Sequence, residues 1–225
     1  MRYDVLLADN DGTLMDFDRS ERIALRSALA AHGIALSEAM QRRYAQINQQ
    51  LWEAFERKET TQEKLRVDRF RIFLKEIGGG VDAQSLSQSF LDELSQRADE
   101  IEGAYDFLRE ASARVPVIIV TNGISSVQRS RFARSRLTPF FSNVVISGEI
   151  GVAKPDPAFV AYALRLAGVS RERALLLGDS LTSDMAAAEA AGVDGCWFNP
   201  RGKSNGTACR PKYEVRSLKE VLTWL

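Results

Sequence analysis

Residues 5–13 read Val5-Leu6-Leu7-Ala8-Asp9-Asn10-Asp11-Gly12-Thr13. The first four residues form an uninterrupted apolar run, which is typical of a strand buried on both faces of a parallel sheet. The run stops at two carboxylates two residues apart, and Gly12 permits a sharp turn at that point. We therefore expect Asp9 and Asp11 at the carboxyl end of a first strand, where both side chains can serve one site.

The same pattern, a short apolar run that ends in small or polar residues, recurs along the chain. The further runs cover residues 115–120, 144–146, 174–177 and 196–198. Helical patterns lie between them, over residues 104–113, 125–136, 158–167 and 183–191. Strands that alternate with helices predict an open α/β sheet with helices on both faces. Ligands bind beyond the carboxyl ends of the strands in such sheets.

Residues 16–98 interrupt this alternation, because they contain helical patterns and no convincing strand. Four helices are expected to begin at capping residues, of which the third also has a glutamate at the capping-box spacing: Ser20, Ser37, Thr60 with Glu63, and Asp82. We predict a catalytic core over residues 1–15 and 99–225, and an inserted helical cap over residues 16–98 that acts as a lid.

Composition excludes several classes of protein. Hydrophobic residues make up 45% of the 225 residues and charged residues 27%, which is typical of a globular protein. Thirty basic residues match thirty acidic ones, so the net charge gives no reason to expect nucleic acid or a membrane as a partner. Two cysteines are too few for a secreted disulfide framework. We expect a cytoplasmic protein that is a monomer or weak dimer.

Four short segments at predicted strand ends carry reactive groups. Asp9 can present an oxygen to phosphorus, and Asp11 can donate a proton to a leaving oxygen and later take one from water. Thr121 supplies a hydroxyl and Asn122 a backbone N–H, both suited to phosphate oxygens. Lys154, followed by Pro155, supplies a fixed positive charge.

The fourth segment, Gly178-Asp179-Ser180-Leu181-Thr182-Ser183-Asp184, adds two more carboxylates. Several acidic residues in one cleft repel one another unless a cation lies among them. Carboxylate oxygens are the ligands that Mg²⁺ prefers. Asp9, Asp11, Asp179 and Asp184 are therefore the candidate metal-binding residues, and Mg²⁺ is the expected cofactor.

In this order, the four segments resemble the motifs of the haloacid-dehalogenase-like hydrolase superfamily. The resemblance implies a Rossmann-like core with strand order 5-4-1-2-3 and a helical cap. It also implies that Asp9 is the nucleophile and forms an aspartyl-phosphate, that Asp11 is the general acid and base, and that Thr121 and Lys154 bind the phosphate. Mg²⁺ would be held by Asp9, the Asp11 carbonyl and Asp179, with Asp184 in a supporting role.

A narrower resemblance rests on Gly148-Glu149-Ile150-Gly151-Val152-Ala153-Lys154-Pro155, Ile119-Val120-Thr121-Asn122-Gly123, Asn48-x-x-Leu51-Trp52 and Arg69-Phe70. This combination looks like the bacterial pyrimidine 5′-nucleotidases, which dephosphorylate nucleoside monophosphates. It makes Asn48, Trp52 and Arg69 candidate substrate-binding residues of the cap. Trp52 could stack on a base and Arg69 could bind a ribose, a base or a second phosphate oxygen, but packing and a salt bridge are equally open roles for them.

The sequence leaves alternative functions open. A sugar-phosphate or phosphoglycolate-type phosphatase would share the catalytic residues and differ in the cap, and so would a β-phosphoglucomutase. A haloacid dehalogenase shares the fold but needs neither a metal nor a second acidic residue, so Asp11 argues against it. A non-catalytic phosphate-binding module would have no need of the intact Asp9. The sequence favours a magnesium-dependent phosphate monoester hydrolase that acts on nucleotides.

Overall fold

The computed structural model describes residues 2–225, and the chain divides into two compact units. The first, which we call the core unit, comprises the residues as far as Phe17, together with Ala98–Ser125 and Phe132–Leu225. The second, the helical unit, comprises Asp18–Arg97 and Ser126–Arg131.

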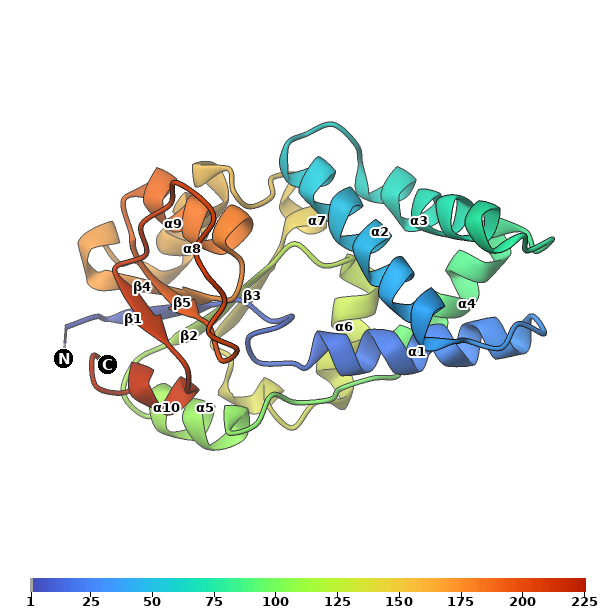
Figure 1. Cartoon of the computed structure of the whole chain (residues 1–225). Coiled ribbons are helices and arrows are strands. Elements are labelled where there is room, and N and C mark those ends of the chain that lie inside the picture. Colours follow the sequence, from blue (N-terminus) through green and yellow to red (C-terminus); the bar gives the residue numbers. More distant parts are fainter. Residues whose placement is uncertain (1) are drawn as a thin grey trace. The chain divides into compact units, whose positions relative to one another are not determined.

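The core unit is built on a six-stranded parallel sheet in the order β3-β2-β1-β4-β5-β6 (Figure 1). The strands are β1 Val5–Ala8, β2 Val117–Thr121, β3 Asn143–Ile146, β4 Ala174–Gly178, β5 Asp194–Phe198 and β6 Tyr213–Val215. The predicted fold class is confirmed. The implied order 5-4-1-2-3 differs in one respect, because β6 extends the sheet beyond β5.

Helices cover both faces of this sheet, as the unbroken apolar runs predict. Leu6 and Ala8 of β1 belong to a core shared with α5 (Ala104–Ser112) and α10 (Leu218–Val221). Val5 and Leu7 belong to a separate core shared with α8 (Pro157–Ala167) and α9 (Ala186–Ala191). Figure 1 shows these two pairs of helices on opposite sides of the strands. Since successive side chains of a strand point to opposite faces, a strand covered on both sides is apolar throughout.

Shorter elements complete the core unit. They are α7 Ser147–Ile150, 3₁₀ turns at Thr138–Phe140 and Arg171–Arg173, and a π-helical turn at Leu181–Met185. Helix α6 Ser125–Arg134 begins and ends in this unit, but its middle, Ser126–Arg131, belongs to the helical unit. The strand register determines which ends meet. Ala8, the last residue of β1, pairs with Ile119 of β2 and with Leu177 of β4. The segments that follow these three strands therefore leave the sheet side by side.

The helical unit contains α1 Phe17–Ala31, α2 Glu38–Glu56, α3 Gln62–Ile77 and α4 Ala83–Ser95. Two predicted caps are confirmed, because the Ser37 and Asp82 side chains accept hydrogen bonds from the first turns of α2 and α4. The other two were wrong. Thr61 caps α3 in place of Thr60. Helix α1 begins three residues before Ser20, whose side chain is buried inside the helix packing.

Aromatic side chains fill the interior of the helical unit. Tyr44 of α2 packs against Phe70 and Phe73 of α3 and Phe90 of α4, with ring centroids 5.2, 5.6 and 5.8 Å apart. These separations are those of favourable tilted and edge-to-face ring pairs. The Tyr44 hydroxyl lies buried without a hydrogen-bond partner in the described part of the chain.

A chain of three buried polar side chains crosses this aromatic interior. Asn48 donates from Nδ2 to Glu21 Oε1 over 2.7 Å and accepts at Oδ1 from Arg69 Nη1 over 3.0 Å. The Arg69 side chain is 1% exposed, and its guanidinium lies over the rings of Phe90 and Phe70 at 4.7 and 5.3 Å. Burial raises the pKa of Glu21 to about 7, although the charge of Arg69 opposes that rise. Asn48 on α2 therefore connects α1 with α3, because its carboxamide bonds to both Glu21 and Arg69.

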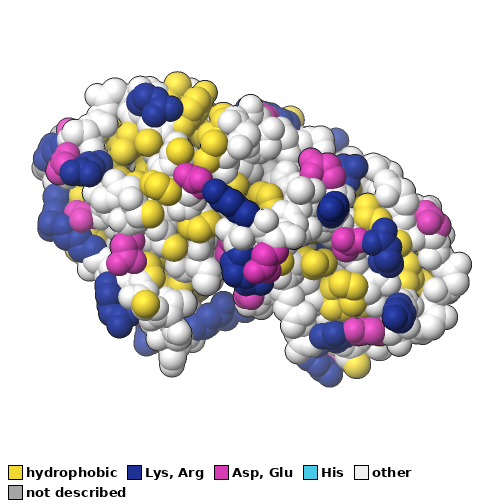
Figure 2. Space-filling view, turned by 90° about the horizontal axis from the view of Figure 1, so that it is seen from above, with side chains coloured by type: hydrophobic (Ala, Val, Ile, Leu, Met, Phe, Trp, Pro, Cys, Tyr) yellow, Lys and Arg dark blue, Asp and Glu magenta, His cyan; other side chains and the backbone are white. Residues whose placement is uncertain are grey.

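No helix among residues 2–225 is long and apolar enough to cross a membrane. Side chains of both charges are spread over the face of the molecule seen in Figure 2, with hydrophobic side chains exposed among them. The distribution agrees with the equal numbers of acidic and basic residues.

We predict that Arg69→Ala lowers the free energy of unfolding by about 2–5 kcal/mol, because it removes a buried side chain from the rings of Phe90 and Phe70, leaves Asn48 Oδ1 unpaired and takes away the positive charge near Glu21. Urea denaturation followed by circular dichroism measures the change. Glu21→Gln, added to Arg69→Ala, should restore part of the loss because a neutral amide needs no counter-charge.

Arg42→Ala is the matched control for that substitution. Arg42 also lies in the helical unit, but its ion pair with Glu38 is at the surface, with the two side chains 71% and 90% exposed. Its removal should change stability by less than about 0.5 kcal/mol. If Arg69→Ala destabilised the protein no more than Arg42→Ala, the buried hydrogen bonds among Glu21, Asn48 and Arg69 would have no structural role.

Candidate active site

The carboxyl edge of the sheet gathers residues from distant parts of the sequence. Asp9 directly follows β1, Thr121 is the last residue of β2, and Asp179 directly follows β4. The backbone N–H of Asp9 still bonds to the Leu177 carbonyl of β4. Because the three strands are parallel neighbours, their ends bring these side chains to one place.

The turn after β1 is shaped by the need to pack closely on Asp179. Gly12 has a φ of 87°, and a Cβ at this position would lie 2.6 Å from Asp179 Oδ2. Only glycine meets both demands. The turn also places the Thr13 hydroxyl 3.4 Å from Asp9 Oδ2 and leaves Asp11 partly exposed.

Lys154 lies at the centre of the site. Its side chain is 2% exposed, and its ammonium group donates to Asp9 Oδ1, Asp184 Oδ1 and the Val120 carbonyl at 2.6, 2.6 and 2.7 Å. A lysine ammonium has three hydrogens, so all of its donors are used. The contacts join residues that follow β1, belong to β2, and follow β4.

The carboxylates outnumber the ammonium. Asp9, Asp179 and Asp184 each offer an oxygen, and these oxygens lie within 4.8 Å of one another. With a single ammonium among three carboxylates, two negative charges remain unbalanced. Burial raises the pKa of Asp9 well above its usual value, with Lys154 opposing and the neighbouring carboxylates adding to the rise. Burial, and then Asp184, raises the pKa of Asp179 to about 7.

Lys154 shows the complementary shift. Burial alone would lower its pKa, but the Asp184 and Asp9 carboxylates outweigh that effect, so the pKa is raised. The lysine therefore keeps its positive charge.

This group of side chains fits a hard divalent cation. The donors are carboxylate oxygens, and the two unbalanced charges equal the charge of Mg²⁺. Trp197 Nε1 donates to the Asp179 carbonyl over 3.0 Å and so holds that segment in place. Asp184 is already engaged at both oxygens, since Oδ1 accepts from Lys154 and Oδ2 from the Ser180 N–H at 3.0 Å. A supporting role for Asp184 suits these contacts better than a direct one.

The remaining predicted phosphate-binding residues lie at the end of β2. The Thr121 side chain is 1% exposed, and its hydroxyl accepts from the Gly123 N–H over 3.0 Å. Asn122 turns its carboxamide toward the backbone of Lys154. That these residues bind phosphate stays a prediction.

The three predicted substrate-binding residues of the cap belong to the helical unit and differ in exposure. Asn48 and Arg69 are 5% and 1% exposed and bond to each other, so their contacts serve the interior of that unit. Trp52 is partly buried and packs edge-on against Phe55, with ring centroids 5.7 Å apart. Contact of any of the three with substrate stays a prediction.

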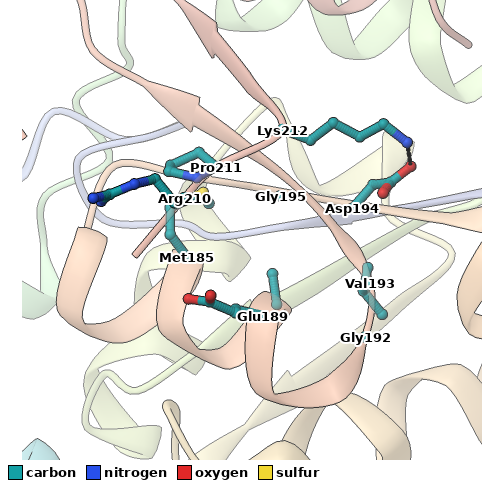
Figure 3. A pocket seen from close by; sticks show the side chains of 10 residues that line it. Met185, Glu189, Gly192, Val193, Asp194, Gly195, Arg210, Pro211 and Lys212 are labelled. Carbon is teal, nitrogen blue, oxygen red and sulfur yellow. Dashed lines mark hydrogen bonds and ion pairs between the residues drawn. The ribbon is translucent and has the colours of Figure 1, made fainter. Parts of the chain in front are cut away.

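A separate pocket of about 310 Å³ lies elsewhere in the core unit (Figure 3). Met185 and Glu189 line one side, Asp194 and Gly195 form the wall at the start of β5, and Arg210 lies opposite. The start of a strand is at the opposite edge of a parallel sheet from Asp9 and Asp179. This pocket is therefore not part of the site.

Several residues that shape the site were not identified from the sequence. Thr13 belongs to the first motif, but its residue type does not predict its position beside Asp9. Trp197 fits the pattern of an apolar strand, and its indole N–H bond to the Asp179 carbonyl has no signal in the sequence. The Val120 carbonyl contributes through the backbone, which residue types do not reveal.

Comparison with known proteins agrees with this geometry. The chain is 38% identical over 221 residues to the HAD-hydrolase YfnB of Bacillus subtilis, a match that covers 98% of this chain and 94% of that protein. It is 36% identical over 227 residues to the pyrimidine 5′-nucleotidase PynA of Streptococcus pneumoniae, covering 100% and 96%. The pyrimidine 5′-nucleotidase YjjG of Escherichia coli is 29% identical, with 98% and 97% covered.

The fold is also similar to that of a known protein of this kind. The crystal structure of YfnB bound to magnesium superposes with a TM-score of 0.93 at 37% identity and covers 99% of this chain and 98% of that one. The model of the haloacid dehalogenase-like hydrolases matches residues 3–192. Asp9, Thr121 and Asp179 lie at strand ends as predicted, whereas Lys154 lies eight residues after β3, on the connection between α7 and α8. The family model and the relatives show that the chain belongs to the haloacid dehalogenase-like hydrolase family.

Proposed function

We propose that this protein hydrolyses phosphate monoesters and that pyrimidine nucleoside 5′-monophosphates are its substrates. The main observation in support of a hydrolase is the buried contact between Asp9 and Lys154, which lies beside two further carboxylates. In this proposal Asp9 is the nucleophile, Lys154 the fixed positive charge, and the neighbouring carboxylates the cation site. The substrate class rests on similarity to PynA and YjjG, which are pyrimidine 5′-nucleotidases.

In the first step, an Asp9 carboxylate oxygen forms a bond to phosphorus as the bond between phosphorus and the ester oxygen breaks. The departing oxygen takes a proton from Asp11, without which an alkoxide is a poor leaving group. Lys154 holds one Asp9 oxygen, which leaves the other, near the Thr13 hydroxyl, for attack. The product is an aspartyl-phosphate on Asp9 and a free nucleoside.

In the second step, Asp11 takes a proton from water, and the resulting hydroxide attacks phosphorus. The bond between phosphorus and Asp9 breaks, so the carboxylate is regenerated and inorganic phosphate leaves. The partial exposure of Asp11 suits a group that must exchange protons with water in both steps. In this proposal Thr121 and the Asn122 N–H bind the phosphoryl oxygens. Lys154, whose three hydrogens are engaged by Asp9, Asp184 and the Val120 carbonyl, acts on those oxygens through its positive charge.

Asp9, Asp179 and the Asp11 carbonyl would hold Mg²⁺, and Asp184 would support them. The ion supplies positive charge that offsets the repulsion between the nucleophile and the phosphoryl group. Lys154 contributes in the same direction, because its raised pKa keeps it charged.

The helical unit supplies selectivity in this proposal. Trp52 is the candidate for stacking on the base, since its indole is partly exposed. Asn48 lies one turn earlier on α2, and with Arg69 it would act by holding that helix in place. A cytoplasmic location, a monomeric or weakly dimeric state and the absence of nucleic acid as a partner remain predictions.

The substrate class is tested with a panel of phosphate monoesters. We predict that pyrimidine nucleoside 5′-monophosphates have a higher kcat/KM than hexose phosphates or phosphoglycolate. Trp52→Ala should lower kcat/KM for nucleotides by about ten- to a hundredfold, because base stacking on an aromatic ring contributes roughly 1–3 kcal/mol. The value for para-nitrophenyl phosphate should change much less. If a hexose phosphate were the best substrate, the protein would still be a phosphatase, but the assignment as a nucleotidase would be wrong.

The nucleophile is tested by Asp9→Asn. The amide is a very weak nucleophile, so we expect kcat to fall by several orders of magnitude while circular dichroism stays unchanged. Release of inorganic phosphate from the best substrate is the measurement. A variant that keeps a tenth of the wild-type kcat would exclude covalent attack by Asp9.

Metal removal tests the cation site. EDTA should abolish turnover and Mg²⁺ should restore it, whereas Ca²⁺ should substitute poorly because it takes looser, higher coordination. Asp179→Asn should weaken Mg²⁺ binding at least tenfold in calorimetry. Lys212→Ala, far from the site at the pocket of Figure 3, should leave it unchanged. Full activity in metal-free protein would refute this assignment.

A further inference from the structure

The Asn122 carboxamide forms two hydrogen bonds with the backbone of Lys154. Its Oδ1 accepts from the Lys154 N–H over 2.9 Å, and its Nδ2 donates to the Lys154 carbonyl over 2.8 Å. A single side chain thus bonds to both polar backbone groups of one residue, as a neighbouring strand would. The same Nδ2 lies 3.4 Å from Ser183 Oγ, next to Asp184 in the chain.

Lys154 needs such support because it is not part of a helix or strand. Residues 151–156 form the irregular connection between α7 and α8. Their backbone cannot be held by the ladder that fixes Asp9 and Asp179 at the ends of β1 and β4. The side chain of Asn122, directly after β2, extends the order of the sheet to this connection.

The position of the Lys154 backbone determines what its ammonium group reaches. The three acceptors of that group lie on three different segments, all within 2.7 Å. Hydrogen bonds this short tolerate little displacement. A misplacement of about 1 Å in an active site can lower the rate about a hundredfold.

We propose that the Asn122 side chain is a positioning residue, which acts on the phosphoryl group through Lys154 and not by direct contact. This inference rests on the proposed phosphatase function and deepens it. It concerns the carboxamide alone and does not change the predicted role of the backbone N–H of Asn122 as a phosphate donor.

A double-mutant cycle tests the proposal. Asn122→Ala should lower kcat/KM for para-nitrophenyl phosphate by about ten- to a hundredfold. In a Lys154→Ala background, the same change should cost less than threefold, because no ammonium group remains to be positioned. If the loss is as large with Lys154 absent as with it present, the side chain acts independently and the proposal is overturned.

Asn205→Ala is the matched control. Asn205 belongs to the same unit and also bonds through its carboxamide to backbone groups, those of Thr207 and Cys209 at 2.9 Å each. It has no contact with Lys154, so kcat/KM should change by less than twofold in both backgrounds. Circular dichroism checks that each variant is folded. If Asn122→Ala does not fold, Asn122→Ser replaces it in the same cycle with the same expectation.

The same four proteins (wild type, the two single variants and the double variant) are compared in their affinity for inorganic phosphate, measured by calorimetry with Mg²⁺ present. Wild-type protein that binds phosphate but turns over no monoester would refute the proposed function, while coupling in phosphate affinity would still support the positioning role. Independent losses in phosphate affinity, or no phosphate binding by the wild type, would overturn the positioning role itself.

Discussion

The charge balance around the Lys154 ammonium is the constraint on which the site depends. A buried ammonium is costly unless its hydrogens are matched, and here each hydrogen has an oxygen at 2.6–2.7 Å. The acceptors that satisfy the lysine also bring the carboxylates together. Burial raises the pKa of Asp9, Lys154 opposes that rise, and the neighbouring carboxylates add to it. A site that stabilises its lysine in this way has an excess of negative charge, and a divalent cation removes that excess.

The parallel sheet provides the rigidity that this balance needs. The register of β1 with β2 and β4 brings Asp9, the Val120 carbonyl and Asp179 to one edge. Close packing then leaves no freedom at two glycines, because a Cβ on Gly12 would meet Asp179 and a Cβ on Gly178 would meet Asp184. Backbone pairing thus places Asp9, Thr121 and Asp179, whereas Lys154 comes from the connection between α7 and α8 and Asp184 from the π-helical turn after β4.

The same physical facts explain how far the sequence could be interpreted. Runs such as Val5–Ala8 are buried on both faces, so their apolar pattern predicts a parallel strand directly. Strand β6 has three residues with an exposed glutamate in the middle, and no run marks it. Ser126–Arg131 packs with the helical unit although it lies over 25 residues beyond the predicted cap, and such long-range packing leaves no local pattern. Motifs locate reactive residues, whereas the partners of Asn122 and Trp197 depend on tertiary contacts.

Arg69 shows why residue type alone is a weak guide in the helical unit. An arginine near an asparagine and a tryptophan suggests a wall for a nucleotide. The guanidinium of Arg69 instead lies over the rings of Phe90 and Phe70 and is linked through Asn48 to Glu21. An arginine side chain that is 1% exposed offers little to a ligand unless the helices rearrange. Trp52 keeps part of its ring exposed on the same helix as Asn48. Under the proposed function, Asn48 and Arg69 would support the helix from inside, and the partly exposed Trp52 would present a rigid aromatic surface to a flat base.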